Sequence, residues 1–130
     1  IADRELGNTI YFLGKLEDER ARLPLEELLI TLPDTASAGR ISGVIKTIGL
    51  IGNPESLPVI MPFAGSAHER VRRQVAVSLG EIGDIGAEET LLLLAQDFFL
   101  DVRSGAERAL GELDYPSTNI DIDEIDDDNN

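Results

Sequence analysis

The stretch VRRQVAVSLGEIGD, residues 71–84, decides the fold, because the chain contains further copies of it. A second copy is VRSGAERALGEL at residues 102–113, and a more distant one is VIKTIGLIGN at residues 44–53. The copies share a glycine, which recurs every 31 residues at Gly49, Gly80 and Gly111. A period of about 20–50 residues is typical of a stacked repeat array. The sequence therefore predicts a repeat architecture.

Each copy has the apolar spacing of an α-helix. In the central copy the apolar residues are separated by four, four and three positions: Val71, Val75, Leu79 and Ile82. This spacing places them on one helical face. A glycine inside a helix costs about 0.5–1 kcal/mol relative to alanine. We therefore expect the repeated glycine to lie where a neighbouring helix approaches too closely for a Cβ.

The residues after the shared glycine predict where one helix ends and the next begins. Gly83 is expected to take the left-handed conformation that ends a helix, and Asp84 is expected to cap the following turn, as Asn53 does one repeat earlier. Pro62 is expected to shorten or kink its helix, because it lacks an N–H. The pattern predicts seven helices, at about residues 3–16, 24–32, 38–51, 56–64, 69–82, 87–97 and 101–113.

The repeat also resembles a known family. The pattern V-R-x-x-V-A-x-x-L-G-E-I-G-D is similar to the HEAT-like repeats first described in phycobilin (phycobilisome) lyase subunits, which also occur in prokaryotic adaptor proteins. The resemblance extends over about residues 5–113. It implies an all-α fold, a right-handed α-α superhelix (a HEAT/armadillo-like solenoid) of about three and a half helical hairpins. It does not imply one activity, because enzymes, chaperones and scaffolds share the repeat.

The C-terminal part of the chain departs from the repeat. Six of the last twelve residues are acidic, and like charges at this density resist compaction. We assign residues 1–115 to the repeat domain and residues 116–130 to an acidic tail, which we expect to be mostly disordered. The alternative is a short interaction segment anchored by isoleucines at 120, 122 and 125. A faint likeness of residues 126–130 to a calcium loop lacks the following glycine and the closing glutamate.

The composition of the chain makes several classes of function less favourable. The 25 acidic and 11 basic residues give a net charge of −14, which repels nucleic acid and favours a basic protein partner. No apolar run is long enough for membrane insertion. The absence of cysteine excludes disulfides and thiolate metal sites. The chain begins at Ile1 without a polar capping helix, which we interpret as truncation of a larger chain.

The residues that could act in catalysis or bind a metal are better explained by a structural role. His68 and Glu69 form a His–acid pair like those that bind iron in the HEAT-fold deoxyhypusine hydroxylases, but one histidine cannot assemble such a site. Glu81 and Glu112 recur in register, and no nucleophile or base is evident beside them. We therefore expect no catalytic residue, no metal and no cofactor.

Arginines and aromatic residues leave alternatives open. Arg72 and Arg103 share one repeat position, either as an anion-binding ridge or as a ladder tied to turn carbonyls and carboxylates such as Asp101; the regular recurrence favours the ladder. Arg72 and its neighbours Arg70 and Arg73 form a candidate contact at the rim. One or two of residues 98–100 (Phe-Phe-Leu) are expected to fill the seam between repeats, whereas an exposed aromatic edge would mark a partner site.

The resemblance implies where a partner would bind. In this family the second helix of each hairpin usually lines the concave face, and the expected outward residues there are Glu26, Glu27, Glu88, Glu89, Gln96 and Asp97. The sequence thus predicts a non-catalytic scaffold that binds a basic or amphipathic partner segment on an acidic groove. The alternatives are a subunit of a phycobilin lyase or related pigment-handling factor, and a purely structural segment of a larger chain.

Overall fold

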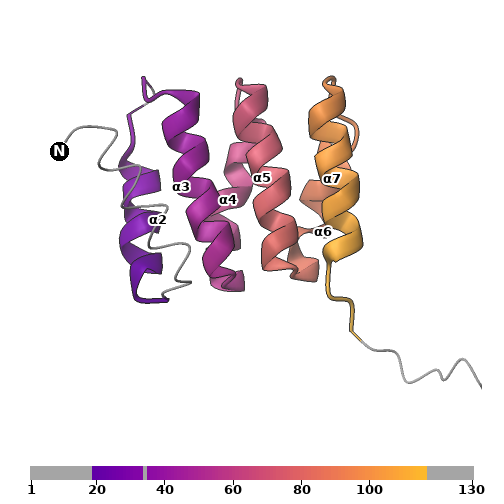
Figure 1. Ribbon diagram of the computed structural model, residues 1–130, viewed down its shortest axis with the longest axis horizontal. Helices are drawn as coiled ribbons and strands as arrows, with labels where there is room; N and C mark the ends of the chain where they lie inside the picture. Colours follow the sequence, from indigo (N-terminus) through magenta and orange to yellow (C-terminus); the bar gives the residue numbers. More distant parts are fainter. Residues whose placement is uncertain (1–18, 34, 117–130) are drawn as a thin grey trace, which may run out of the picture.

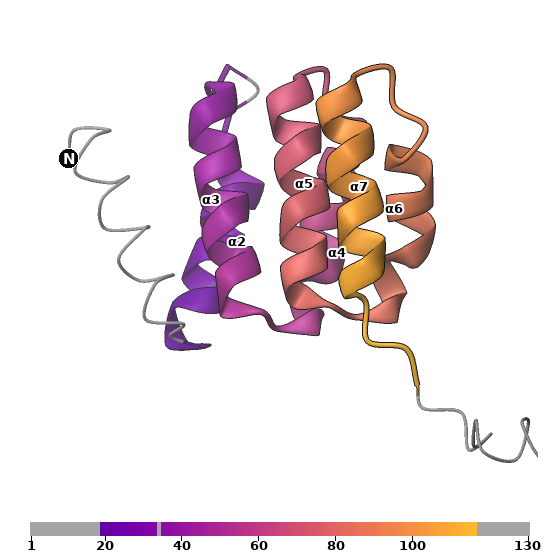
Figure 2. The ribbon, with the colours of Figure 1, turned by 45° about the vertical axis from the view of Figure 1, so that its right-hand side comes forward.

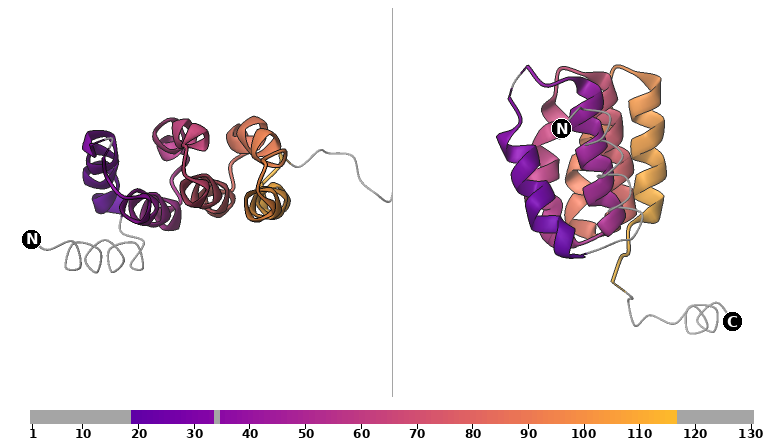
Figure 3. Two further views of the ribbon diagram at one scale, coloured as in Figure 1. Left: turned by 90° about the horizontal axis from the view of Figure 1, so that it is seen from above. Right: turned by 60° about the vertical axis from the view of Figure 1, so that its left-hand side comes forward.

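The computed structural model describes residues 19–33 and 35–116, which form two layers of helices. The longer helices α3, α5 and α7 lie side by side in one layer (Figure 1), and the shorter helices α2, α4 and α6 form the layer behind them (Figures 2 and 3). We call these the long-helix layer and the short-helix layer. The helices are α2 (Arg22–Thr31), α3 (Ala38–Ile51), α4 (Leu57–Ile60), α5 (Glu69–Ile82), α6 (Glu88–Leu94) and α7 (Leu100–Glu112).

Four short 3₁₀ turns complete the connections: η1 (Glu19–Ala21), η2 (Pro54–Ser56), η3 (Met61–Gly65) and η4 (Ile85–Ala87). The part of the chain that the structure describes contains no strand, and its single isolated bridge joins Asp84 to Asp114. Because α5 packs along both α3 and α7, the predicted α-solenoid is confirmed. The helix expected at residues 3–16 and the acidic tail beyond residue 116 lie outside the described residues.

Glycine and Asx residues set the ends of the hairpins. Gly52 ends α3 with a φ of 77°, and Gly83 ends α5 with a φ of 74°. The next residue in each case, Asn53 or Asp84, accepts a hydrogen bond through Oδ1 from the amide two residues later, at 2.8 and 2.9 Å. The same residue types therefore reverse the chain in successive repeats.

Proline shortens the second helix of the middle hairpin. The α-helical part of α4 has only four residues, and the chain continues as the five-residue 3₁₀ turn η3, which contains Pro62. Proline provides no N–H for an α-helical hydrogen bond, so the helix changes to the tighter form at this point. The expected helix at residues 56–64 is thus present in two forms.

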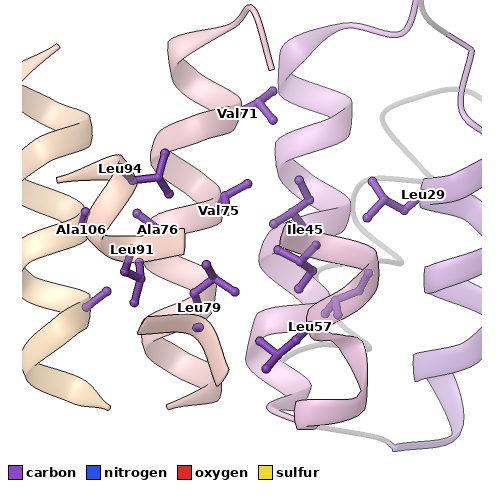
Figure 4. Packing of buried hydrophobic residues seen from close by; sticks show 14 of the residues in the cluster. Leu29, Ile45, Leu57, Val71, Val75, Ala76, Leu79, Leu91, Leu94 and Ala106 are labelled. Atoms are coloured by element: carbon purple, nitrogen blue, oxygen red, sulfur yellow. The ribbon is translucent and has the colours of Figure 1, made fainter. Parts of the chain in front are cut away.

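One continuous core connects the described helices. The predicted apolar stripe of α5 points inward, with Val71, Val75 and Leu79 fully buried, and Leu91 of α6 meets it from the other layer (Figure 4). Burial of each such side chain contributes about 1.5–3 kcal/mol. None of the described helices is long and apolar enough to cross a membrane.

The phased glycines of α3 and α5 lie where long helices meet. A Cβ added to Gly49 would lie 2.7 Å from the Ser78 Cβ, and a Cβ added to Gly80 would lie 2.8 Å from the Ala109 Cβ. The expectation of a close approach is wrong at Gly111, where a Cβ would meet nothing within 4 Å among the described residues. The reason is positional, because α7 is the last described helix of its layer.

Candidate functional site

The acidic residues expected on the short-helix layer divide into exposed and internal groups. Glu27, Glu89 and Gln96 are exposed, as expected. Glu88 is half-buried, and its carboxylate accepts a hydrogen bond from the Tyr115 hydroxyl. That bond raises the pKa of Tyr115 above its ordinary value. The exposed members of the set therefore lie on α2, on α6 and just after α6.

Glu26 is not an outward residue, although the sequence suggested one. It is only 8% exposed. Its Oε2 atom accepts hydrogen bonds from Arg22 Nη1 at 2.7 Å and from Ser56 Oγ at 2.9 Å. A buried carboxylate is stable only with such partners. Glu26 therefore joins α2 to the next hairpin and is not available to a partner.

Asp97 is also an internal residue. Arg72 Nε donates to Asp97 Oδ2 at 2.7 Å and Arg72 Nη2 donates to Oδ1 at 3.1 Å, and both side chains are mostly buried. This two-bond geometry is the strong form of an ion pair. It holds the pKa of Asp97 below its ordinary value, chiefly through the hydrogen bond from Arg72. Asp97 thus fixes the turn between α6 and α7.

The two phased arginines make equivalent contacts in successive repeats. Arg72 Nη1 donates to the Ser66 carbonyl at 2.9 Å, and Arg103 Nη1 donates to the Asp97 carbonyl at the same distance. Each acceptor lies six residues before its arginine. The arrangement is a structural ladder whose carboxylate is Asp97, where the sequence suggested Asp101. An arginine in this position ties a helix start to the turn before it.

The turn held by this ladder carries an apolar edge on the surface. Phe98 is 89% exposed, Phe99 43% and Leu100 65%, so the expectation that one or two of them fill the seam is wrong. The Phe98 and Phe99 rings meet edge to face at 5.5 Å, and Arg72 lies 5.7 Å from the centre of the Phe99 ring. The positions one repeat earlier, residues 67–69, are also exposed although α7 follows them in the layer. This edge is therefore a surface of the array, not a seam.

Two leucines extend the apolar edge along α6. Leu92 and Leu93 are exposed, Leu93 by 67%. Glu89 lies three and four residues before them, so all three side chains share one side of the helix. Sequence reasoning missed these leucines. The signal was the run of four leucines at 91–94, because four consecutive residues circle a helix once and only the first and the last of them share its buried side.

We call this combined region the α6 surface; it comprises Glu89, Leu92, Leu93, Gln96, Phe98 and Leu100. It joins large exposed apolar side chains to a carboxylate and an amide. Apolar patches on the surface of a protein commonly mark interaction sites. Among the described residues no three side chains of histidine, aspartate or glutamate gather as metal ligands would. The chemistry that this surface offers is burial and charge pairing.

The comparison with protein families agrees with the arrangement of the helices. A family model described as HEAT repeats matches residues 36–111. The matched segment includes α3, α4, α5, α6 and most of α7. The comparison with curated proteins gives no match.

Proposed function

Because the chain belongs to the HEAT repeat family, we propose that it works without catalysis, as a scaffold that binds another protein. HEAT repeats are commonly protein-interaction scaffolds. The proposed partner is an amphipathic segment with apolar anchors and basic side chains, and its proposed binding site is the α6 surface.

The observation that carries this proposal is the exposure of Leu93 on the side of α6 that Glu89 shares, together with the exposure of Phe98 in the turn after α6. Burying an exposed leucine or phenylalanine against a partner contributes about 1.5–3 kcal/mol. Aromatic anchors are frequent among the residues that dominate binding. A basic side chain in the partner would pair with Glu89, and the net charge of −14 would speed its approach. An acidic or purely polar segment would gain neither contact.

The turn beneath the apolar edge supports the proposal, because binding to a rigid surface costs less ordering entropy. Asp97 receives two hydrogen bonds from Arg72, and its Oδ1 also accepts from the Phe99 amide at 3.0 Å. Arg103 Nη1 donates to the Phe98 carbonyl at 3.0 Å. The backbone that presents the aromatic rings is thus fixed before a partner arrives.

Affinity capture with matched variants tests the proposal. The immobilised chain is incubated with a cell extract, and retained proteins are identified by mass spectrometry. We expect a specific partner to be lost with Leu93→Ser and weakened with Glu89→Lys. Glu107→Lys makes the same charge change on an exposed position of α7 and should retain it. Retention by all three variants, or equal loss with both lysine variants, would exclude the α6 surface as the binding site.

A phycobilin lyase subunit is the second candidate function. Its support is the resemblance of residues 71–84 to the repeat subtype of those subunits. In that role the solenoid would hold an apoprotein and a bilin. Mixing the chain with a free bilin and recording visible absorbance distinguishes the two functions. A red-shifted spectrum of bound pigment supports the lyase role, and an unchanged spectrum of free bilin contradicts it.

A further inference from the structure

A basic groove runs between α3 and α5. These two helices belong to the long-helix layer, whereas α6 belongs to the short-helix layer (Figure 3). The volume of the groove is about 500 Å³. It is lined by Gly39, Ser42, Gly43 and Lys46 of α3 and by Arg70, Arg73, Gln74 and Val77 of α5. We call it the α3–α5 groove.

Small residues of α3 keep this groove open. A Cβ added to Gly43 would meet no atom of the described residues within 4 Å, so none of them fills the space above this backbone. Gly39 has a different role, because a Cβ there would lie 3.1 Å from Arg70 Nη1. The guanidinium of Arg70 therefore reaches across from α5 and rests against α3. The backbone of α3 at Gly43 thus forms the base of the groove, and the guanidinium of Arg70 lies over the backbone at Gly39.

The charge of the groove is opposite to that of the chain. Among the described residues that line the groove, three of eight are cationic and none is acidic, whereas the chain carries a net charge of −14. Neither Arg70 nor Arg73 makes an ion pair with another residue of the described ranges 19–33 and 35–116. A local positive potential in such a chain attracts an anion.

The repeat supplies an internal comparison. A groove of about 450 Å³ occupies the same place between α5 and α7, and three carboxylates line it beside Arg73 and Arg108: Glu81, Asp101 and Glu112. Arg108 lies 62 residues, two repeat periods, after Lys46. The two grooves therefore have similar volumes and differ in the charge of their lining residues. Positive charge is a property of the α3–α5 groove and not of the repeat.

An unsatisfied hydroxyl points to a ligand. Ser42 is only 6% exposed, and its Oγ has no hydrogen-bond partner in the described part of the chain. A buried polar group without a partner costs about 1–3 kcal/mol. Because neighbouring atoms cover the Oγ, the Ser42 side chain must rotate toward the groove before an oxyanion there can accept its hydrogen bond and pair with Arg70 and Arg73, which line the same groove. Bonds of this charge-assisted kind are the strong ones.

We propose that the α3–α5 groove binds a carboxylate side chain of an acidic segment in a partner protein. The carboxylate enters above Gly43, accepts from Ser42 Oγ and pairs with Arg70 and Arg73. An extended peptide fits an open groove between two helices. A nucleic acid is disfavoured, because its many phosphates would meet the acidic remainder of the chain. This second surface is independent of the α6 surface and has the opposite charge preference.

Fluorescence polarisation with the full chain and a labelled oligoglutamate peptide tests this proposal. We expect binding that weakens at high salt and is lost with an oligoglutamine peptide. Arg70→Glu should weaken the affinity about tenfold. Arg108→Glu makes the same charge change in the α5–α7 groove and should weaken it less than about threefold. Equal effects of the two variants, or no binding of the wild type, would overturn the proposal.

Ser42→Ala provides a readout that a folding defect cannot imitate. Removing the unsatisfied hydroxyl should raise the melting temperature of the free protein, while the affinity for oligoglutamate falls about fivefold. A fall in both, or a rise in melting temperature with unchanged affinity, would contradict the role assigned to Ser42. A single-stranded oligonucleotide that binds more tightly than the peptide would overturn the choice of a protein partner.

Discussion

Replacing Gly49 by alanine tests the packing of the long-helix layer. The new Cβ would lie 2.7 Å from both Cβ and Oγ of Ser78 and 2.9 Å from the Ser78 Cα. Ordinary contacts begin near 3.4 Å, so α3 and α5 would have to separate by about 0.7 Å. The hydrogen bond from Ser78 Oγ to the Ile45 carbonyl, now 3.1 Å long, would be strained as well. We expect overpacking to cost about 1–3 kcal/mol of unfolding free energy.

Gly43→Ala is the matched control, because it makes the same substitution in the same helix. Its Cβ would meet no atom of residues 19–33 and 35–116 within 4 Å, so alanine should stabilise α3 by about 0.5–1 kcal/mol. Urea unfolding followed by circular dichroism measures both variants. We expect Gly43→Ala to be the most stable of the three proteins, the wild type to be intermediate and Gly49→Ala to be the least stable. A Gly49→Ala variant as stable as Gly43→Ala would refute the close approach of α3 and α5.

The ion pairs give two further predictions. Asp97→Asn should lower the unfolding free energy by about 1–3 kcal/mol at neutral pH. Because Arg72 lowers the folded-state pKa of Asp97 below the ordinary 3.8, this stabilisation is present above that value and is lost as the pH falls through the lowered pKa. Urea unfolding at several pH values should show the gap from wild type closing in acid, and a gap independent of pH would contradict it. Glu26→Ala should lower the unfolding free energy by about 1–3 kcal/mol, because Arg22 and Ser56 lose a buried partner. Glu27→Ala, the control, should change the unfolding free energy by less than about 0.5 kcal/mol. Equal urea midpoints for these two variants would contradict the internal role of Glu26.

The sequence alone predicted the helices because the information is local and repeated. The bounds expected for the first helix of the two complete hairpins, residues 38–51 and 69–82, agree with α3 and α5. The apolar period defined each helix, and Gly52 and Gly83 defined the ends. Pro62 foretold the weakened α4. Each of these features depends on the properties of a residue and its close neighbours in the chain.

The candidate surface was harder to predict because exposure depends on distant residues. Glu26 and Glu27 are adjacent, and a helix turns by about 100° per residue. Ser56, thirty residues later, decides which of the two is internal. Asp97 is likewise an internal residue because it pairs with Arg72, which lies 25 residues earlier. The repeat period predicts which positions of a helix are equivalent, but it does not predict which distant residue will bind a given side chain.

The exposed aromatic edge at residues 98–100 was only the alternative interpretation of the sequence, for a related reason. The aromatic residues at 98 and 99 follow a helix that the sequence suggested would continue to residue 97, whereas α6 ends at Leu94. Residues 95–97 therefore belong to the turn and not to the helix, and the aromatic side chains that follow them lie on the surface. In this turn Arg72 binds the Asp97 carboxylate, and Arg103 binds the backbone carbonyls of Asp97 and Phe98. The exposure of the aromatic side chains therefore depends on the arginine ladder.

The central claim is that α3, α5 and α7 stack at one regular spacing, and spin-label distances test it most directly. Lys46, Val77 and Arg108 lie 31 residues apart, one on each long helix. The chain has no cysteine, so pairs of introduced cysteines can be labelled cleanly. Neighbouring helices pack about 8–10 Å apart, so the distance from 46 to 108 should be about twice that from 46 to 77 and from 77 to 108. A 46-to-108 distance no longer than the other two would contradict the stacked array.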